Sequence, residues 1–145
     1  MTTIAIKDGI LAADTQLTWS NERHLTTKIK RIETTKIVIA CAGSAHHEWR
    51  AHEIFGDPNW KSLELSEKAK DFAAIVVIDH KLHLCTSNYV PIPINGKYLA
   101  IGSGAAYALA AMYLGCSAVD SIKVASEFDV NTNKRIDTYD FTKET

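Results

Sequence analysis

The chain has 145 residues, of which 46% are hydrophobic and 23% charged, and its net charge is −1. This length and composition are typical of one globular domain, here expected over residues 1–145, whose core needs no disulfide or metal. Nucleic acid and anionic membranes attract a concentrated basic face, so the balanced charge argues against both as main partners. No apolar run reaches the roughly 18 residues of a membrane span, and no secretory signal is recognisable. The three cysteines are far apart, which predicts free thiols and a cytoplasmic protein.

A tight turn is predicted near the start of the chain. Asp8-Gly9 separates two short apolar runs, and both turn residues tolerate positive φ. A polar segment over 14–27 follows, in which no helix or strand is predicted. Glu33-Thr34-Thr35 then separates a second pair of runs. The strands expected in this part of the chain are 3–6, 10–13, 28–32 and 36–41.

Two helices are predicted in the middle of the chain. Ser44 is suited to cap the first, over 45–55, and Gly56-Asp57-Pro58 ends it. Helical spacing places an aromatic face on this helix, made of Trp49, His52 and Phe55. A short second helix is expected over 62–69.

The second half is predicted to alternate between strands and helices. Gly102-Ser103-Gly104 ends a strand, Gly115 ends an alanine-rich helix, and Ser117 begins a capping box. The elements expected are strands 73–78, 82–85, 98–101 and 135–141, a helix over 105–114, and another from the Ser117 cap to about 128. This order predicts an α+β fold in which two sheets stack and each is covered by a helix pair.

Several short motifs occur in a specific order along the chain. They are Thr2-Thr3-Ile4, Ala13-Asp14, Lys28, Ala42-Gly43-Ser44-Ala45, Ala100-Ile101-Gly102-Ser103-Gly104 and Asp129-Val130-Asn131-Thr132. In this order and spacing, over residues 2–139, the sequence resembles the proteasome β/HslV-like family of N-terminal-nucleophile (Ntn) hydrolases. The resemblance implies the four-layer αββα sandwich of that fold, with mainly antiparallel sheets. It also implies a threonine endopeptidase that needs no cofactor.

The resemblance implies that Thr2 is the nucleophile once Met1 has been removed. An N-terminal threonine carries a hydroxyl nucleophile and an α-amine on one residue. The amine has a reference pKa of about 7.7–8, which suits a general base near neutral pH. An internal threonine lacks that base, so removal of Met1 is expected to activate the protein.

The family's other catalytic residues carry over onto named positions. Lys28 is implied to stabilise negative charge at the Thr2 oxygen, and Asp14 to pair with Lys28. The backbone N–H of Gly43 is implied to form the oxyanion hole. The residues implied to hold and tune the amine are Ser103, Asp129 and Thr132. The family's usual Ser-Gly is Thr132-Asn133 here: threonine keeps the hydroxyl, and asparagine tolerates a left-handed backbone.

Substrate recognition is implied to be strand addition, in which an extended polypeptide pairs with the backbone around Thr18 and residues 43–45. The residues expected to line the pocket beside the scissile bond are Leu17, Cys41, Ala45 and Trp49, which predicts an apolar P1 residue. The family also implies a homo-oligomeric ring. The helical segment over 44–71 is short for this family, which leaves ring size, ring stacking and an unfoldase ATPase partner open.

Two other functions fit the same residues. One is an Ntn amidohydrolase acting on small amides, and the other is a catalytically silent structural subunit. Retention of the nucleophile and its partners argues against a silent subunit, since a scaffold has no use for that chemistry. A metal site is not expected, because the histidines show no HExxH spacing. A phosphate site is not expected at Gly102-Ser103-Gly104, which lacks the third glycine.

Overall fold

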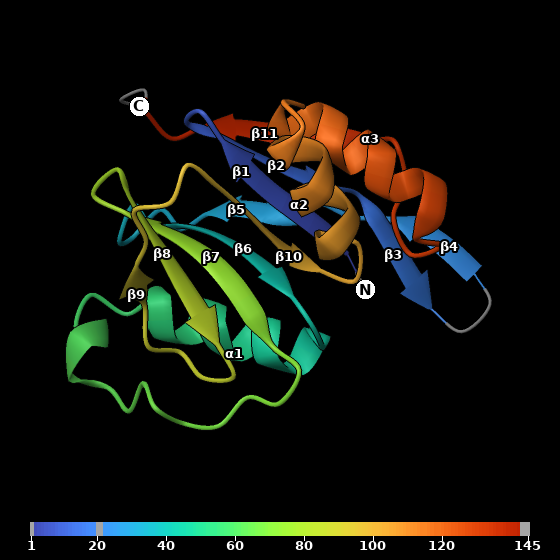
Figure 1. The fold of residues 1–145 in the computed structure, drawn as a ribbon. Helices are drawn as coiled ribbons and strands as arrows, with labels where there is room; N and C mark the ends of the chain where they lie inside the picture. Colours follow the sequence, from blue (N-terminus) through green and yellow to red (C-terminus); the bar gives the residue numbers. More distant parts are fainter. Residues whose placement is uncertain (1, 20–21, 143–145) are drawn as a thin grey trace. The chain divides into compact units, whose positions relative to one another are not determined.

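The computed structural model describes residues 2–19 and 22–142 (Figure 1). The chain forms two compact units. Unit 1 runs from the start of the chain to Ile29 and resumes at Gly96, and unit 2 spans Lys30–Asn95. Each unit has its own sheet and its own buried apolar cluster.

Unit 1 contains a four-stranded antiparallel sheet in the order β10-β1-β2-β11, and two helices pack against it (Figure 1). Its elements are β1 (Thr3–Lys7), β2 (Ile10–Asp14), β10 (Tyr98–Gly102), α2 (Ala105–Tyr113), α3 (Ala118–Phe128) and β11 (Ile136–Asp140). The turn between β1 and β2 has φ of 52° at Asp8 and 80° at Gly9, which confirms the predicted hairpin. Ser117 accepts a hydrogen bond from the Asp120 N–H, as the predicted cap requires.

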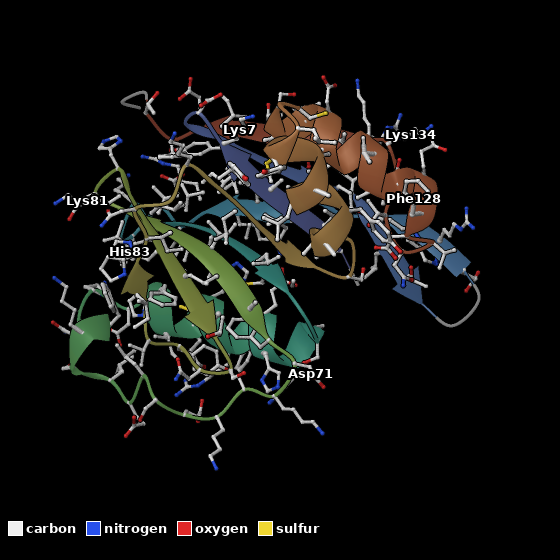
Figure 2. All side chains as sticks on the ribbon, viewed as in Figure 1. Lys7, Asp71, Lys81, His83, Phe128 and Lys134 are labelled. Atoms are coloured by element: carbon white, nitrogen blue, oxygen red, sulfur yellow. The ribbon has the colours of Figure 1, made fainter. Side chains whose placement is uncertain are left out.

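Small side chains line the contact between this sheet and its helices. Alanines from β1, β2, β10, α2 and α3 meet there around Met112 and Ile122. Because alanine adds little bulk, the two helices lie close to the sheet. Lys7, labelled in Figure 2, donates to the carbonyls of Met112 at 3.3 Å and Cys116 at 2.8 Å. Its charge therefore lies at the C-terminal end of α2, where a helix favours cations.

Unit 1 also contains a two-stranded hairpin that the sequence did not predict. It consists of β3 (Gln16–Trp19) and β4 (Glu22–Leu25), within the segment expected to be irregular. All four residues of β4 are exposed, so no apolar alternation marks the strand. The Thr26 N–H donates to the Thr15 carbonyl at 2.8 Å, which closes the hairpin at its base.

Unit 2 contains a five-stranded sheet in the order β5-β6-β7-β8-β9, and α1 contacts β6. Its elements are β5 (Ile29–Arg31), whose first residue ends unit 1, β6 (Val38–Ala42), α1 (Ala45–Phe55), a 3₁₀ turn (Trp60–Ser62), β7 (Ala73–Ile78), β8 (Lys81–Thr86) and β9 (Ile92–Pro93). The predicted hairpin of β7 and β8 is confirmed, with φ of 51° at Asp79 and 62° at His80. The two-residue strand β9 was not predicted, since a strand containing proline gives little pattern.

The second helix predicted for this region is wrong. Residues 63–69 contain no helix, because their backbone groups bond elsewhere. The Leu65 carbonyl accepts from the Tyr89 N–H at 2.8 Å, and the Ala69 N–H donates to the Ser87 carbonyl at 2.9 Å. The Glu64 side chain also caps the Ser66 N–H at 2.9 Å, a local bond that competes with helix formation. The sheet of unit 2 is therefore not covered by a helix pair: α1 is the one α-helix among the described residues of this unit.

The aromatic residues predicted to share one face of α1 differ in their burial. Ser44 caps the helix as expected, and Phe55 is fully buried. Trp49, however, is 62% exposed, and the buried face consists of Ala51, Ile54 and Phe55. Ile54 is fully buried.

Candidate functional site

Asp14 lies at the centre of a buried polar cluster in unit 1. It ends β2, where the pairing of Asp14 with Ile136 and of Ala13 with Ile4 places it between β1 and β11. Its side chain is fully buried, and Lys28 Nζ lies 2.7 Å from its Oδ1. A buried carboxylate is stable only when it is paired and hydrogen-bonded, so Lys28 and the surrounding N–H donors are required by Asp14.

Thr2 lies directly against this ion pair. Its Oγ1 donates to Asp14 Oδ1 at 2.5 Å and accepts a hydrogen bond from Lys28 Nζ. Thr2 is only 3% exposed, so little water reaches its hydroxyl. An ammonium group in direct contact with the hydroxyl stabilises negative charge that develops on the Thr2 oxygen, and low solvent access strengthens this stabilisation. The arrangement suits a hydroxyl that acts as a nucleophile.

A glycine holds the backbone of Thr2 in place. Thr3 pairs with Gly102 at the end of β10, and Gly102 has φ of +100°. A Cβ atom at this position would collide with the carbonyl oxygen of Thr2. Only glycine combines this backbone conformation with so close an approach.

A second acidic residue organises a separate hydrogen-bond network. Asp129, immediately after α3, accepts from Ser103 Oγ at 2.6 Å and from Thr132 Oγ1 at 2.7 Å. Ser103 Oγ also lies 3.3 Å from the carbonyl oxygen of Thr2. Burial acts to raise the pKa of the Asp129 carboxyl, but hydrogen bonds from Ser103, Thr132 and the Asn131 N–H outweigh it, and the pKa lies below its ordinary value. Asp129 is therefore a charged acceptor at neutral pH.

Thr3 joins the two acidic residues, a role that was not predicted from the sequence. Its N–H donates to Asp14 Oδ1 at 3.1 Å. Its Oγ1 lies 2.7 Å from Thr132 Oγ1, which already donates its one proton to Asp129, so Thr3 is the donor. Thr3 is fully buried. No sequence pattern around a threonine at the start of a strand predicts this role.

Asn133 also binds Asp14, a contact that was not predicted from the sequence. Its N–H donates to Asp14 Oδ2 at 3.3 Å, as does the N–H of Gln16. Asn133 is not among the described residues with positive φ, so the left-handed backbone that asparagine tolerates is not used here. The asparagine side chain instead bonds Thr15.

The predicted site residues therefore fall into two groups. Unit 1 brings together Thr2, Asp14, Lys28, Ser103, Asp129 and Thr132. It also holds Leu17, 45% exposed, and Thr18, whose Oγ1 lies 3.4 Å from Asn131 Oδ1. The predicted residues that belong to unit 2 are Gly43, Cys41, Ala45 and Trp49.

Within unit 2, Gly43 has a backbone that requires glycine. Its φ is +130°, and a Cβ would lie 2.5 Å from the carbonyl oxygen of Asp71, a residue labelled in Figure 2. Cys41 is 8% exposed, and burial raises the pKa of its thiol well above the ordinary value. A thiol in this state is a poor nucleophile. Ala45 and Trp49 are exposed on α1.

Nowhere in residues 2–19 and 22–142 do three or more His, Cys, Asp or Glu side chains gather in a group that could hold a metal ion. Within the same ranges, no helix has the length and apolar character to cross a membrane.

Comparison with known proteins adds independent information on the fold. No model of a known protein family matches the sequence. The ATP-dependent protease subunit HslV of Campylobacter fetus subsp. fetus (strain 82-40) is 27% identical over 161 aligned residues, covering 92% of this chain and 89% of that protein.

Solved structures are also similar over nearly the whole chain. Thiobacillus denitrificans BPH has a TM-score of 0.69 at 19% identity, covering 95% of each chain. Its complex with epoxomicin has a TM-score of 0.70 at 20% identity, covering 95% of this chain and 96% of that one. HslV from Trypanosoma brucei has a TM-score of 0.65 at 20% identity, covering 95% of this chain and 97% of that one. These matches confirm the predicted α+β, Ntn-hydrolase fold with antiparallel sheets and helices.

Proposed function

Since the chain belongs to the proteasome β/HslV-like family of Ntn hydrolases, we propose that it is a threonine endopeptidase whose nucleophile is Thr2 after removal of Met1. The observation that carries the proposal is the buried Thr2 hydroxyl, which contacts both Lys28 and Asp14. A structural threonine at a strand start needs neither partner. A nucleophile needs both a stabilising cation and a fixed orientation.

In the proposed reaction, Thr2 Oγ1 attacks the carbonyl carbon of the scissile peptide bond. The α-amine of Thr2, freed by removal of Met1, takes the hydroxyl proton and later passes it to the leaving amine. Lys28 stabilises the negative charge that develops at the attacking oxygen, while Asp14 holds Lys28 in place. Water then hydrolyses the resulting ester and restores Thr2.

The Asp129 network is proposed to orient the α-amine. Ser103 Oγ, bonded to Asp129, lies 3.3 Å from the Thr2 carbonyl oxygen and so reaches the backbone of the nucleophile. The negative charge of Asp129 favours the protonated amine that forms during attack. Thr132 supplies a second hydroxyl to the same carboxylate at 2.7 Å.

The remaining parts of the site are proposals from the family alone. Gly43 is proposed to supply the oxyanion-hole N–H. The proposed substrate-binding residues are Leu17, Thr18, Cys41, Ala45 and Trp49, around an apolar P1 side chain. Polypeptides as substrates, a homo-oligomeric ring, one domain over 1–145 and a cytoplasmic location stay predictions.

The test is an activity assay on protein whose mass shows that Met1 is absent. We expect this preparation to cleave fluorogenic peptides with an apolar P1 residue, and epoxomicin, the ligand of the similar BPH, to inhibit it. Thr2→Ala is expected to abolish cleavage. Cleavage by a preparation that retains Met1, or by Thr2→Ala, would contradict the proposal. Hydrolysis of small amides alone, by a monomer in sedimentation, would favour the amidohydrolase.

A further inference from the structure

Asn133 makes two bonds to the same stretch of chain. Its backbone N–H donates to Asp14 Oδ2 at 3.3 Å, and its side-chain Oδ1 accepts from the Thr15 N–H at 3.0 Å. Thr15 directly follows Asp14, so one residue binds both the carboxylate of Asp14 and the peptide group after it. Together the two bonds close a ring between the segment after α3 and the end of β2.

The side chain of Thr15 completes this contact. Its Oγ1 has one proton, and the nearest acceptor is the Arg135 carbonyl at 2.7 Å. Oγ1 therefore accepts from Asn133 Nδ2, at 3.2 Å. Thr15 is 5% exposed, so water does not replace these bonds easily.

We propose that Asn133 and Thr15 are positioning residues that form a clamp on Asp14 and so fix its carboxylate against Lys28 and Thr2. The catalytic consequence of the clamp rests on the proposed peptidase function. A glycine at position 133 could donate its N–H but could not bind Thr15. The Asn133 side chain is therefore needed to hold the Asn133 backbone N–H beside Asp14, because it binds the N–H of Thr15, the residue that follows Asp14.

The position of Asp14 matters because its two oxygens serve different partners. Oδ1 binds Lys28 Nζ, Thr2 Oγ1 and the Thr3 N–H, whereas Oδ2 binds the N–H groups of Gln16 and Asn133. Rotation of the carboxylate away from Asn133 would move Oδ1 relative to Lys28 and Thr2. Misplacement of reacting groups by about 1 Å can lower a rate by about 100-fold.

The kinetic test uses Asn133→Ala and Thr15→Val in protein that lacks Met1. Each variant is expected to lower kcat about tenfold and to leave KM within about twofold, because the loss affects the reacting groups and not substrate binding. Thr15→Ser keeps the hydroxyl and is expected to restore kcat. The matched controls are Asn95→Ala and Thr138→Val, both at exposed positions. An unchanged kcat in both clamp variants, or no recovery with Thr15→Ser, would overturn the proposal.

A second measurement does not depend on activity. The amide protons of Thr3 and Gln16 both bond to Asp14, so their NMR shifts and hydrogen-exchange rates report on its carboxylate. Asn133→Ala is expected to shift both signals and to speed exchange of the Thr15 amide about tenfold, even in a Thr2→Ala background. Unchanged signals would overturn the clamp. If instead wild-type protein is inactive while these signals respond, the peptidase proposal fails and the clamp stands.

Discussion

Thr3 Oγ1 lies 2.7 Å from Thr132 Oγ1, and this contact links the Asp14 and Asp129 networks. The Thr3 N–H donates to the Asp14 carboxylate, and the Thr3 hydroxyl donates to Thr132, whose own hydroxyl donates to the Asp129 carboxylate. Gly104 leaves room for the contact, because a Cβ there would collide with Thr3 Oγ1. The residue next to the proposed nucleophile thus sets the relative position of both acids.

Thr3→Val is expected to break this link while keeping the shape of the side chain. Thr132 then lacks a donor in a buried site, and the free energy of unfolding should fall by about 1–3 kcal/mol. Urea denaturation of Thr3→Val and Thr3→Ser measures the effect. Thr3→Ser retains the hydroxyl, so a loss equal to that of Thr3→Val would show that the hydroxyl is not responsible.

Lys28→Met is expected to abolish peptide cleavage and to destabilise the fold. The substitution leaves the carboxylate of Asp14 fully buried without its cation, a change that typically costs about 3–5 kcal/mol. Adding Asp14→Asn removes the uncompensated charge, so the double variant should recover part of the stability and remain inactive. Equal stability of the single and double variants in urea denaturation would contradict this account.

Gly102→Ala is expected to be far more harmful than Gly115→Ala. Both glycines have similar φ, +100° and +106°, so both alanines strain the backbone, typically by about 1–3 kcal/mol. At Gly102 the new Cβ would collide with the carbonyl oxygen of Thr2, whereas at Gly115 no atom lies within 4 Å of the new Cβ. Thermal denaturation and peptide cleavage of the two variants measure the difference. Full activity of Gly102→Ala would contradict the proposed placement of Thr2.

The stability of the protein is expected to fall in acid partly through Asp129. Its pKa is lower in the folded chain than in the unfolded one, so the charged form favours folding. This contribution is present above the unfolded pKa, about 3.9, and is lost as pH falls through the folded pKa. Asp129→Asn should therefore differ most from wild type near neutral pH, with the difference shrinking below about pH 4. A difference that grows in acid during urea denaturation would contradict the direction of the shift.

Much of the fold could be predicted because its signals are local. The turn at Asp8-Gly9, the caps at Ser44 and Ser117, and the glycine that ends α2 each depend on a few adjacent residues. The helix predicted over 62–69 was wrong because backbone groups of this segment form hydrogen bonds with residues distant in the sequence, such as Tyr89 and Ser87. The β3–β4 hairpin was not predicted because an exposed strand such as β4 needs no alternation of apolar and polar residues.

The sequence alone determined which side chains are available for catalysis. The order of its motifs was sufficient to predict that Thr2, Asp14 and Lys28 belong to one site. Only the tertiary structure decided that Thr3 and Asn133 bind the same carboxylate as Lys28. Hydrogen bonds act over about 3 Å in space, whereas Asn133 lies 119 positions from Asp14 along the chain. A pattern of neighbouring residues carries no record of so distant a partner, and the pairing of β2 with β11 is what brings the two together.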